Sequence, residues 1–160
     1  MTVIAYSSKF KVLAADSRCS DATGMHLTNC QKVFRLRNGA VLGTAGDSDD
    51  RDVRELLSRA TPRKMPARAQ LAELKSQFFG LLVFPKGTVY TVDVYHREFD
   101  HEGEWAASVD VIRDPIVAVG CGAPFAYGAM EVGADPIRAV RAACRRDTAC
   151  ALPVQWEKIG

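Results

Sequence analysis

Short runs rich in β-branched and apolar residues predict four strands early in the chain, at residues 2–6, 11–15, 32–36 and 40–46. Residues 7–10 form a tight turn between the first two strands, and Asn38-Gly39 joins the last two. Asn-Gly between two such runs is the strongest short hairpin signal. The polar stretch 19–29, which contains Gly24, is predicted to be a loop. We therefore expect antiparallel hairpins before the first helix.

A helical period follows the fourth strand. The first expected helix is capped by Asp47 or Ser48, has acidic residues Asp49, Asp50 and Asp52 in its first turn, and has an apolar stripe of Val53, Leu56, Leu57 and Ala60. The second is expected to begin at Pro66, with Ala67, Leu71, Leu74 and Phe78 on one face. Two further helices are expected at 124–132 and 136–146, the latter capped by Asp135.

Strand patterns return between the two helix pairs. They predict strands at 81–84, 88–95, 105–112 and 116–119, a loop at 96–104, and a last strand at 153–156. Because strands and helices come in separate blocks, the pattern favours an α+β protein in which helix pairs cover antiparallel sheets. The chain has 160 residues, which suits one domain, residues 1–160, with a substantial core.

Composition and charge argue against several classes of partner. With 48% hydrophobic residues and a formal net charge of +2, the chain gives no argument for nucleic acid or an anionic membrane. No stretch approaches the roughly 20 apolar residues that a membrane-spanning helix needs. No secretory signal precedes the first strand, so we expect a cytoplasmic protein whose five cysteines are reduced thiols.

Two glycine-containing segments invite a nucleotide-binding interpretation without supporting it. Gly120-Cys121-Gly122 lies between a predicted strand and a helix, but Phe125 stands where a dinucleotide fingerprint needs its third glycine. The segment 43–46 has no lysine at the spacing of a phosphate-binding loop. The histidines lack the spacing of zinc ligands: His26, His96 and His101. We expect neither a cofactor nor a metal.

The candidate chemistry centres on Thr2. If Met1 is removed, Thr2 carries both a hydroxyl nucleophile and a free α-amine. Asp16 and Lys32 stand at ends of predicted strands, where they could form a surface salt bridge contributing about 0–1 kcal/mol. Alternatively they flank Thr2. A lysine beside an α-amine disfavours the ammonium form and makes the amine a better base, and the aspartate would orient the lysine.

Several motifs occur in an order and spacing that point to one family. Thr2 opens a strand, Ala14-Ala15-Asp16-Ser17-Arg18 ends the next, Lys32-Val33 begins the third and Gly43-Thr44-Ala45-Gly46 ends the fourth. Further motifs follow: Ala118-Val119-Gly120-Cys121-Gly122, Gly128-Ala129-Met130, Gly133-Ala134-Asp135, Ala139-Val140-Arg141-Ala142-Ala143 and Asp147-Thr148-Ala149-Cys150. Together they resemble the proteasome β-subunit family, which includes the bacterial HslV peptidase, over nearly the whole chain.

The resemblance implies an N-terminal-nucleophile hydrolase with a four-layer αββα sandwich. Thr2 would be the nucleophile and its α-amine the general base, held and tuned by Asp16 and Lys32. The backbone N–H of Gly46 would form the oxyanion hole. The backbone of Ser20 would hold extended substrate. Small uncharged side chains would line the pocket for the residue before the scissile bond and favour small to medium apolar residues: Cys19, Cys30 and Thr44.

The supporting residues depart from the family pattern at two positions. Arg18 and Asp147 match it, whereas Cys121 and Cys150 stand where the family has serines that hydrogen-bond near the N-terminus. A thiol is a weaker donor than a hydroxyl, so the support around the amine is poorer.

The leading interpretation is a threonine-type endopeptidase that cleaves unfolded polypeptide inside a homo-oligomeric ring, with an ATP-driven unfoldase as partner. Two alternatives stay open. One is a catalytically inactive ring or assembly subunit on the same fold. The other is a small-molecule amidohydrolase of the N-terminal-nucleophile class.

Overall fold

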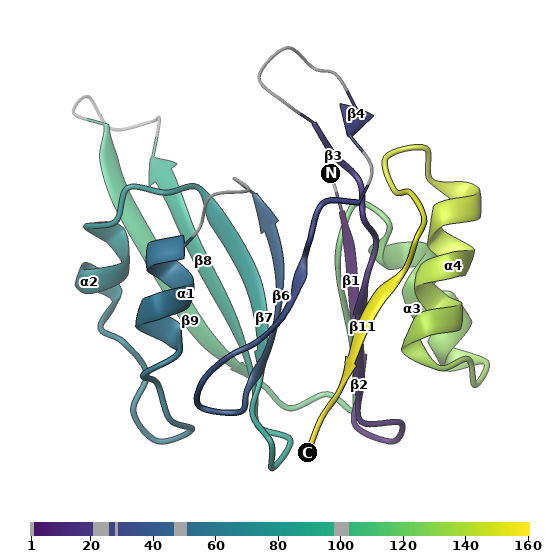
Figure 1. Cartoon of the computed structure of the whole chain (residues 1–160), viewed down its shortest axis with the longest axis horizontal. Coiled ribbons are helices and arrows are strands. Elements are labelled where there is room, and N and C mark those ends of the chain that lie inside the picture. Colours follow the sequence, from purple (N-terminus) through teal and green to yellow (C-terminus); the bar gives the residue numbers. More distant parts are fainter. Residues whose placement is uncertain (1, 21–25, 28, 47–50, 98–102) are drawn as a thin grey trace.

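Two antiparallel β-sheets lie face to face in the computed structural model, and helices cover their outer sides (Figure 1). The structure describes residues 2–20, 26–27, 29–46, 51–97 and 103–160. The strand order is β10-β1-β2-β11 in one sheet and β5-β6-β7-β8-β9 in the other. Two short strands, β3 (Cys19–Ser20) and β4 (His26–Leu27), pair separately.

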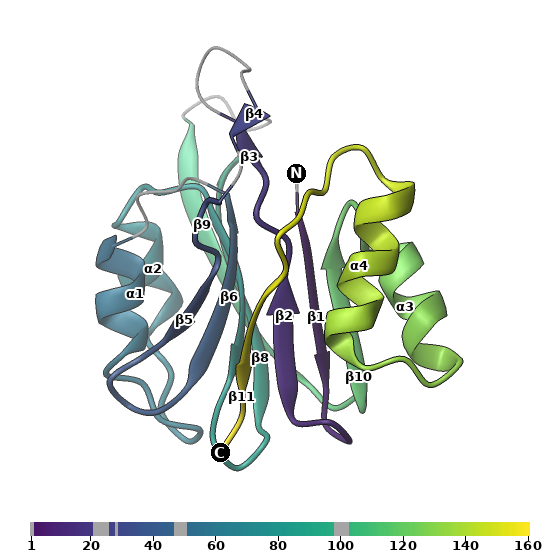
Figure 2. The same cartoon turned by 45° about the vertical axis from the view of Figure 1, so that its right-hand side comes forward.

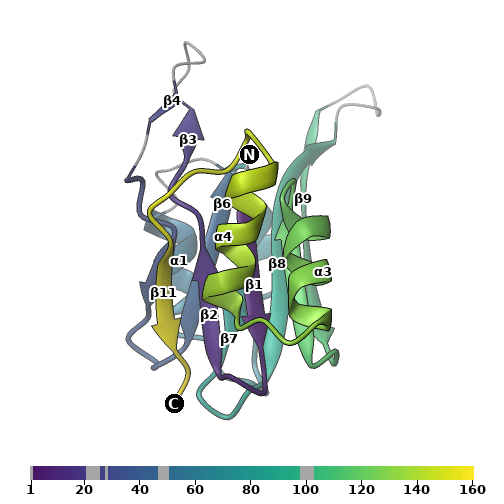
Figure 3. The ribbon, with the colours of Figure 1, turned by 90° about the vertical axis from the view of Figure 1, so that its right-hand side faces the viewer.

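The strands and helices have the following bounds. The four-stranded sheet contains β10 (Ile116–Gly120), β1 (Val3–Ser7), β2 (Val12–Ala15) and β11 (Gln155–Lys158). The five-stranded sheet contains β5 (Val33–Arg35), β6 (Val41–Gly46), β7 (Phe78–Val83), β8 (Val89–Arg97) and β9 (Glu104–Ile112). Helices α1 (Arg51–Leu57) and α2 (Arg68–Ala72) cover the five-stranded sheet (Figure 1), and α3 (Ala123–Glu131) and α4 (Pro136–Arg146) cover the other (Figure 3). Within the described residues, no helix has the length and apolar character needed to cross a membrane.

The side chains of each strand alternate between two faces, and this separates three apolar clusters. The first lies between the sheets and includes Ile4 and Leu13 from one sheet and Leu81 and Val83 from the other. The second packs α1 and α2 onto the five-stranded sheet, and the third packs α3 and α4 onto the four-stranded sheet. The predicted α+β class with two antiparallel sheets is therefore confirmed, and the arrangement is compatible with a four-layer sandwich.

The register of β1 brings distant residues to one edge of the sheet. β1 runs antiparallel to both neighbours, so that Val3 lies opposite Gly120 in β10 and Ile4 lies opposite Ala15 in β2. Thr2, at the beginning of β1, consequently lies beside the residues that follow the ends of β2 and β10. Residues separated by more than 100 positions in the chain meet there.

The C-terminal strand links the two sheets. β11 pairs with β2 and also lies beside β5 of the other sheet (Figure 2). Arg35 of β5 donates through Nη2 to Glu157 Oε2 at 2.6 Å and to the Lys158 carbonyl at 2.6 Å. These contacts join the two sheets where β5 lies beside β11.

Four local predictions are wrong. Helix α2 ends at Ala72, Lys75 after it has a φ of 50° that no α-helix continues through, and Phe78 begins β7 instead of facing a helix. The predicted loops at 19–29 and 96–104 contain β3, β4 and the end of β8, where backbone pairing extends the strands. The last strand begins at Gln155, two residues later than expected. The predicted cap and first acidic turn of α1, residues 47–50, lie outside the described residues.

Candidate active site

Thr2 is buried just before β1, and its hydroxyl accepts a hydrogen bond from Lys32 Nζ. The Lys32 ammonium also donates to Asp16 Oδ1 at 2.8 Å. The side chains of Lys32 and Asp16 are only 7% and 0% exposed, so the pair is not the surface salt bridge that was one of the two interpretations. The structure thus brings the three predicted catalytic residues together as a buried chain of contacts.

Asp16 is held by hydrogen bonds to both of its oxygens. Besides Lys32, Oδ1 accepts from Val3 N at 3.1 Å, and Oδ2 accepts from Arg18 N at 3.0 Å and from Ala151 N at 3.2 Å. A carboxylate is costly to bury unless it is both paired with a cation and hydrogen-bonded, and both conditions hold here. Asp16 therefore holds the Lys32 ammonium in one position.

Gln155 in β11 positions the backbone at Lys32. Its Oε1 accepts from Lys32 N at 2.8 Å and from Val33 N at 3.3 Å. Its Nε2 donates to the Cys30 carbonyl at 2.6 Å and to Ser17 Oγ at 3.0 Å. One side chain thus connects the segment before β5 to the segment after β2, which fixes the base of the lysine relative to the aspartate.

The main chain of Thr2 is held by the segment that follows β10. Thr2 N donates to Cys121 Sγ at 3.2 Å, and Cys121 Sγ donates back to the Thr2 carbonyl at 3.2 Å. Gly120 has a φ of +93°, and a Cβ there would lie 2.2 Å from the Thr2 carbonyl oxygen. Only glycine permits this approach. Cys121 consequently lies beside the nitrogen that would become the α-amine.

Asp147 and Cys150 lie next to Cys121, in the segment after α4. Cys150 Sγ donates to Asp147 Oδ2 at 3.7 Å, and Asp147 Oδ1 accepts from Ala149 N at 2.8 Å. The Ala149 hydrogen bond is the main reason that the pKa of the Asp147 carboxyl lies below its ordinary value, with further help from the two thiols and Arg18. Burial and the surrounding negative charges raise the pKa of the Cys150 thiol, which is therefore neutral.

Cys19 and Cys30 form a disulfide, so the expectation of five reduced thiols is wrong for this pair. β3 pairs with β4, and the Cα atoms of Cys19 and Cys30 lie 6.1 Å apart, within the usual range for a disulfide. The other three cysteines are free: Cys121, Cys144 and Cys150. Two of the predicted substrate-pocket residues are thus one cross-linked element.

The other predicted substrate and oxyanion residues lie on β6 and β3. Thr44 is buried, and its N–H donates to the Lys32 carbonyl at 2.8 Å. Gly46 is the last residue of β6, opposite Phe78 in β7. Ser20 is exposed in β3, opposite His26 in β4.

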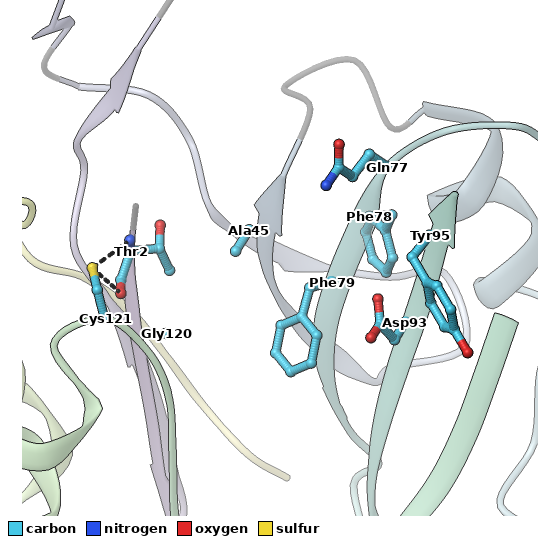
Figure 4. Close-up of a pocket in the computed structure, with 9 residues that line it drawn as sticks. All are labelled: Thr2, Ala45, Gln77, Phe78, Phe79, Asp93, Tyr95, Gly120 and Cys121. Carbon is cyan, nitrogen blue, oxygen red and sulfur yellow. Dashed lines mark hydrogen bonds between the residues drawn. The ribbon is translucent and has the colours of Figure 1, made fainter. Parts of the chain in front are cut away.

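A pocket of about 470 Å³ lies beside Thr2 (Figure 4). Thr2, Gly120 and Cys121 line one side of it. The other side is lined from the five-stranded sheet by Ala45, Gln77, Phe78, Phe79, Asp93 and Tyr95. The volume lies within the roughly 300–1,000 Å³ typical of small-ligand sites. The cavity beside Thr2 is thus lined mostly by apolar groups, with the carboxylate of Asp93 among them.

This geometry suits a nucleophilic hydroxyl. A buried ammonium that donates to Thr2 Oγ1 stabilises negative charge developing on that oxygen. The same region contains three side chains whose ligand atoms lie within 4.8 Å of one another: Cys121, Asp147 and Cys150. Zinc binds cysteine sulfur as thiolate, so this group could hold a metal ion only if binding released the protons of both thiols.

Sequence reasoning missed Gln155 and Asp93, and it named Cys121, Asp147 and Cys150 as supporting residues but not as possible metal ligands. Nothing in the local pattern marks Gln155, because its partners lie more than 100 residues away. The metal ligands come from two segments that only the folded chain brings together. Asp93 did have a signal: it is an acidic residue in the alternating strand β8, on the same face as Val89 of the inter-sheet core.

Comparison with known proteins shows similarity in structure but not in sequence. No protein-family model matches the chain, and no curated protein matches it. A solved structure of Thiobacillus denitrificans BPH in complex with epoxomicin matches with a TM-score of 0.67 and 16% sequence identity, over 99% of this chain and 100% of that chain. The chain therefore has the fold of a protein that was solved with epoxomicin bound.

Proposed function

We propose that the protein is a threonine-type N-terminal-nucleophile peptidase that acts through Thr2 once Thr2 is the first residue of the mature chain. The observation that carries the proposal is the buried hydrogen bond from Lys32 to the Thr2 hydroxyl, with Asp16 behind it. A buried ammonium is costly, and its alignment on a hydroxyl suits the activation of a nucleophile. The fold shared with a protein solved with epoxomicin, a proteasome inhibitor, supports the same conclusion.

In the proposed reaction, Thr2 Oγ1 attacks the carbonyl carbon of a peptide bond while its proton passes through a water to the α-amine. The Lys32 ammonium stabilises the charge that develops on Oγ1, and the Gly46 N–H is assigned to the carbonyl oxygen. The protonated α-amine then gives its proton to the leaving nitrogen as the C–N bond breaks. This leaves an ester on Thr2, which water hydrolyses with the same amine as base.

We further propose that the natural substrate is unfolded polypeptide and that copies of the chain form a ring around their sites, served by an ATP-driven unfoldase. These points rest on the family resemblance of the motifs around Thr2, Asp16 and Lys32. Native mass from light scattering tests the ring. A monomer at every concentration would contradict it.

The test of the chemistry compares the wild type with Thr2→Ala and Thr2→Ser on a fluorogenic peptide, together with the intact mass of each protein. We expect chains that have lost Met1 to hydrolyse the peptide, Thr2→Ser to keep measurable activity, and Thr2→Ala to lose roughly 10³-fold or more in kcat. Equal rates of hydrolysis by the wild type and Thr2→Ala would refute the proposal.

A second candidate is a non-catalytic subunit on the same fold. It is favoured by Cys121, whose thiol is a weak hydrogen-bonding group beside the Thr2 nitrogen. Intact mass separates the two candidates. A chain that retains Met1 has the Thr2 nitrogen in a peptide bond and lacks the base, which would favour the non-catalytic subunit.

A further inference from the structure

The inner face of the five-stranded sheet changes character along β7 and β8. Val83 pairs with Val89 in the apolar core between the sheets. Side chains alternate with a period of two, so Phe79 and Asp93, which pair with each other further along the same strands, also face the other sheet. An acidic residue at a position of this kind breaks the pattern of a buried face, and such breaks are expected at functional sites.

Asp93 lines the pocket beside Thr2 and is half-buried there. Figure 4 shows its carboxylate between the rings of Phe79 and Tyr95. Within the described part of the chain, no hydrogen bond or ion pair reaches this carboxylate, and no lysine or arginine lines the pocket. Burial raises the pKa of the Asp93 carboxyl above its ordinary value, so a bound cation would favour its ionised form.

The pocket borders the contact between Thr2 N and Cys121. In the proposed mechanism the α-amine gives a proton to the departing nitrogen, so that nitrogen must lie near Thr2 N. Thr2 N contacts Cys121, and Cys121 and Gly120 line this pocket. A leaving nitrogen that takes its proton from Thr2 N would therefore bring the residue after the scissile bond to this pocket.

We propose that this pocket is a leaving-group subsite that selects a lysine or arginine directly after the scissile bond, with Asp93 as the residue that determines specificity. The proposal rests on the peptidase function proposed above. A long basic side chain matches the lining: its aliphatic stem packs on the rings of Phe79 and Tyr95, and its charged end reaches the carboxylate. A glutamate in the same place would meet like charge, and a neutral side chain would leave Asp93 unpaired.

The first experiment uses peptides that differ only in the residue after the scissile bond: lysine, its uncharged analogue norleucine, or glutamate. We expect kcat/KM of the wild type to be about tenfold higher for lysine than for norleucine, a difference of about 1.4 kcal/mol. Glutamate should be the poorest. In Asp93→Asn the ratio of lysine to norleucine should fall close to one.

Asp110→Asn is the matched control, because Asp110 is an exposed acid on the neighbouring strand β9 and pairs with Arg68 at 3.8 Å. It should keep the wild-type ratio. A wild-type ratio near one, or a high ratio that survives Asp93→Asn, would overturn the subsite while leaving the peptidase proposal intact.

A second measurement separates the subsite from the chemistry. Fluorescence anisotropy gives the affinities of dye-labelled lysine and norleucine peptides for the Thr2→Ala protein, with and without Asp93→Asn. Tighter binding of the lysine peptide that depends on Asp93 supports the subsite even if no peptide is hydrolysed. Equal affinities, as expected if a second copy of the chain fills the pocket, overturn it.

Discussion

The substitution Asp16→Asn tests the buried ion pair at the centre of the site. Asp16 is fully buried, and its two oxygens accept from Lys32 Nζ at 2.8 Å and from the backbone N–H groups of Val3, Arg18 and Ala151 at 3.0–3.2 Å. Asparagine keeps the shape but removes the charge. Its NH₂ group also turns one acceptor into a donor, which then faces N–H groups that have nothing to donate to.

The expected loss of stability is large for a single substitution. Removing one partner of a buried ion pair costs about 3–5 kcal/mol, because the other charge stays buried without compensation. The total free energy of unfolding of a domain is about 5–15 kcal/mol. At about 2–4 °C for each kcal/mol in a chain of this size, the expected fall in Tm is about 6–20 °C.

Urea and thermal unfolding followed by circular dichroism measure this effect without any assumption about activity. Lys32→Met should cost less, because Asp16 keeps three backbone donors. The double substitution Asp16→Asn/Lys32→Met should recover part of the loss, because the unpaired ammonium is gone. Asp110→Asn, an exposed control, should stay within about 0.5 kcal/mol of the wild type. An Asp16→Asn protein as stable as this control would refute the reasoning.

Three further predictions concern the same region. Gly120→Ala should lower the free energy of unfolding by roughly 1–3 kcal/mol, because the left-handed φ of +93° strains alanine and its Cβ would collide with the Thr2 carbonyl oxygen. Unchanged stability in urea unfolding would contradict the close contact between Gly120 and Thr2. The pKa of Asp147 is lowered chiefly by the Ala149 N–H, so its contribution to stability is present above the ordinary pKa of an aspartate and is lost as pH falls through the lowered value. Asp147→Asn should flatten that acid limb of the curve of stability against pH, and an unaltered curve would exclude this role. Burial raises the pKa of Cys144 to about 11, so its thiol should react with iodoacetamide at pH 8 only after unfolding. Mass spectrometry measures the labelling, and a Cys144 that is labelled in the native protein would contradict this.

Local sequence predicts most of the secondary structure because the relevant signals lie within a few residues of each other. Helix α4 has the predicted bounds Pro136–Arg146, and Asp135 caps it by accepting from Arg138 N at 2.9 Å. The cap, the proline in the first turn and the arginines in the last turn all act within the helix itself. The prediction that Phe78 lies on a helix is wrong because Phe78 pairs with β6 on one side and β8 on the other. The periodicity of a single segment does not show which distant strands it will pair with.

The grouping of Thr2, Asp16 and Lys32 could be predicted because each stands at the end of a strand pattern and the motifs resemble a known family. Their burial could not, since it depends on how Lys32, just before β5 of one sheet, meets Thr2 and Asp16 at the edge of the other. Asp93 gave a readable signal as an acid on an inward-facing position, but only the opposing sheet shows that it faces the pocket beside Thr2.

The sequence by itself determined most of the strands and helices and the α+β class, because these follow from composition and short-range periodicity, whereas the candidate nucleophile Thr2 came from the family resemblance. Tertiary structure decided that the Cys121 thiol accepts from Thr2 N and donates to the Thr2 carbonyl, that Gln155 holds the backbone of Lys32 and that Cys19 bonds to Cys30. The first two contacts join residues more than 100 positions apart, and the third depends on strand pairing inside a loop. Their geometry is set by strand register and by the packing of one sheet on the other, which are properties of the whole chain.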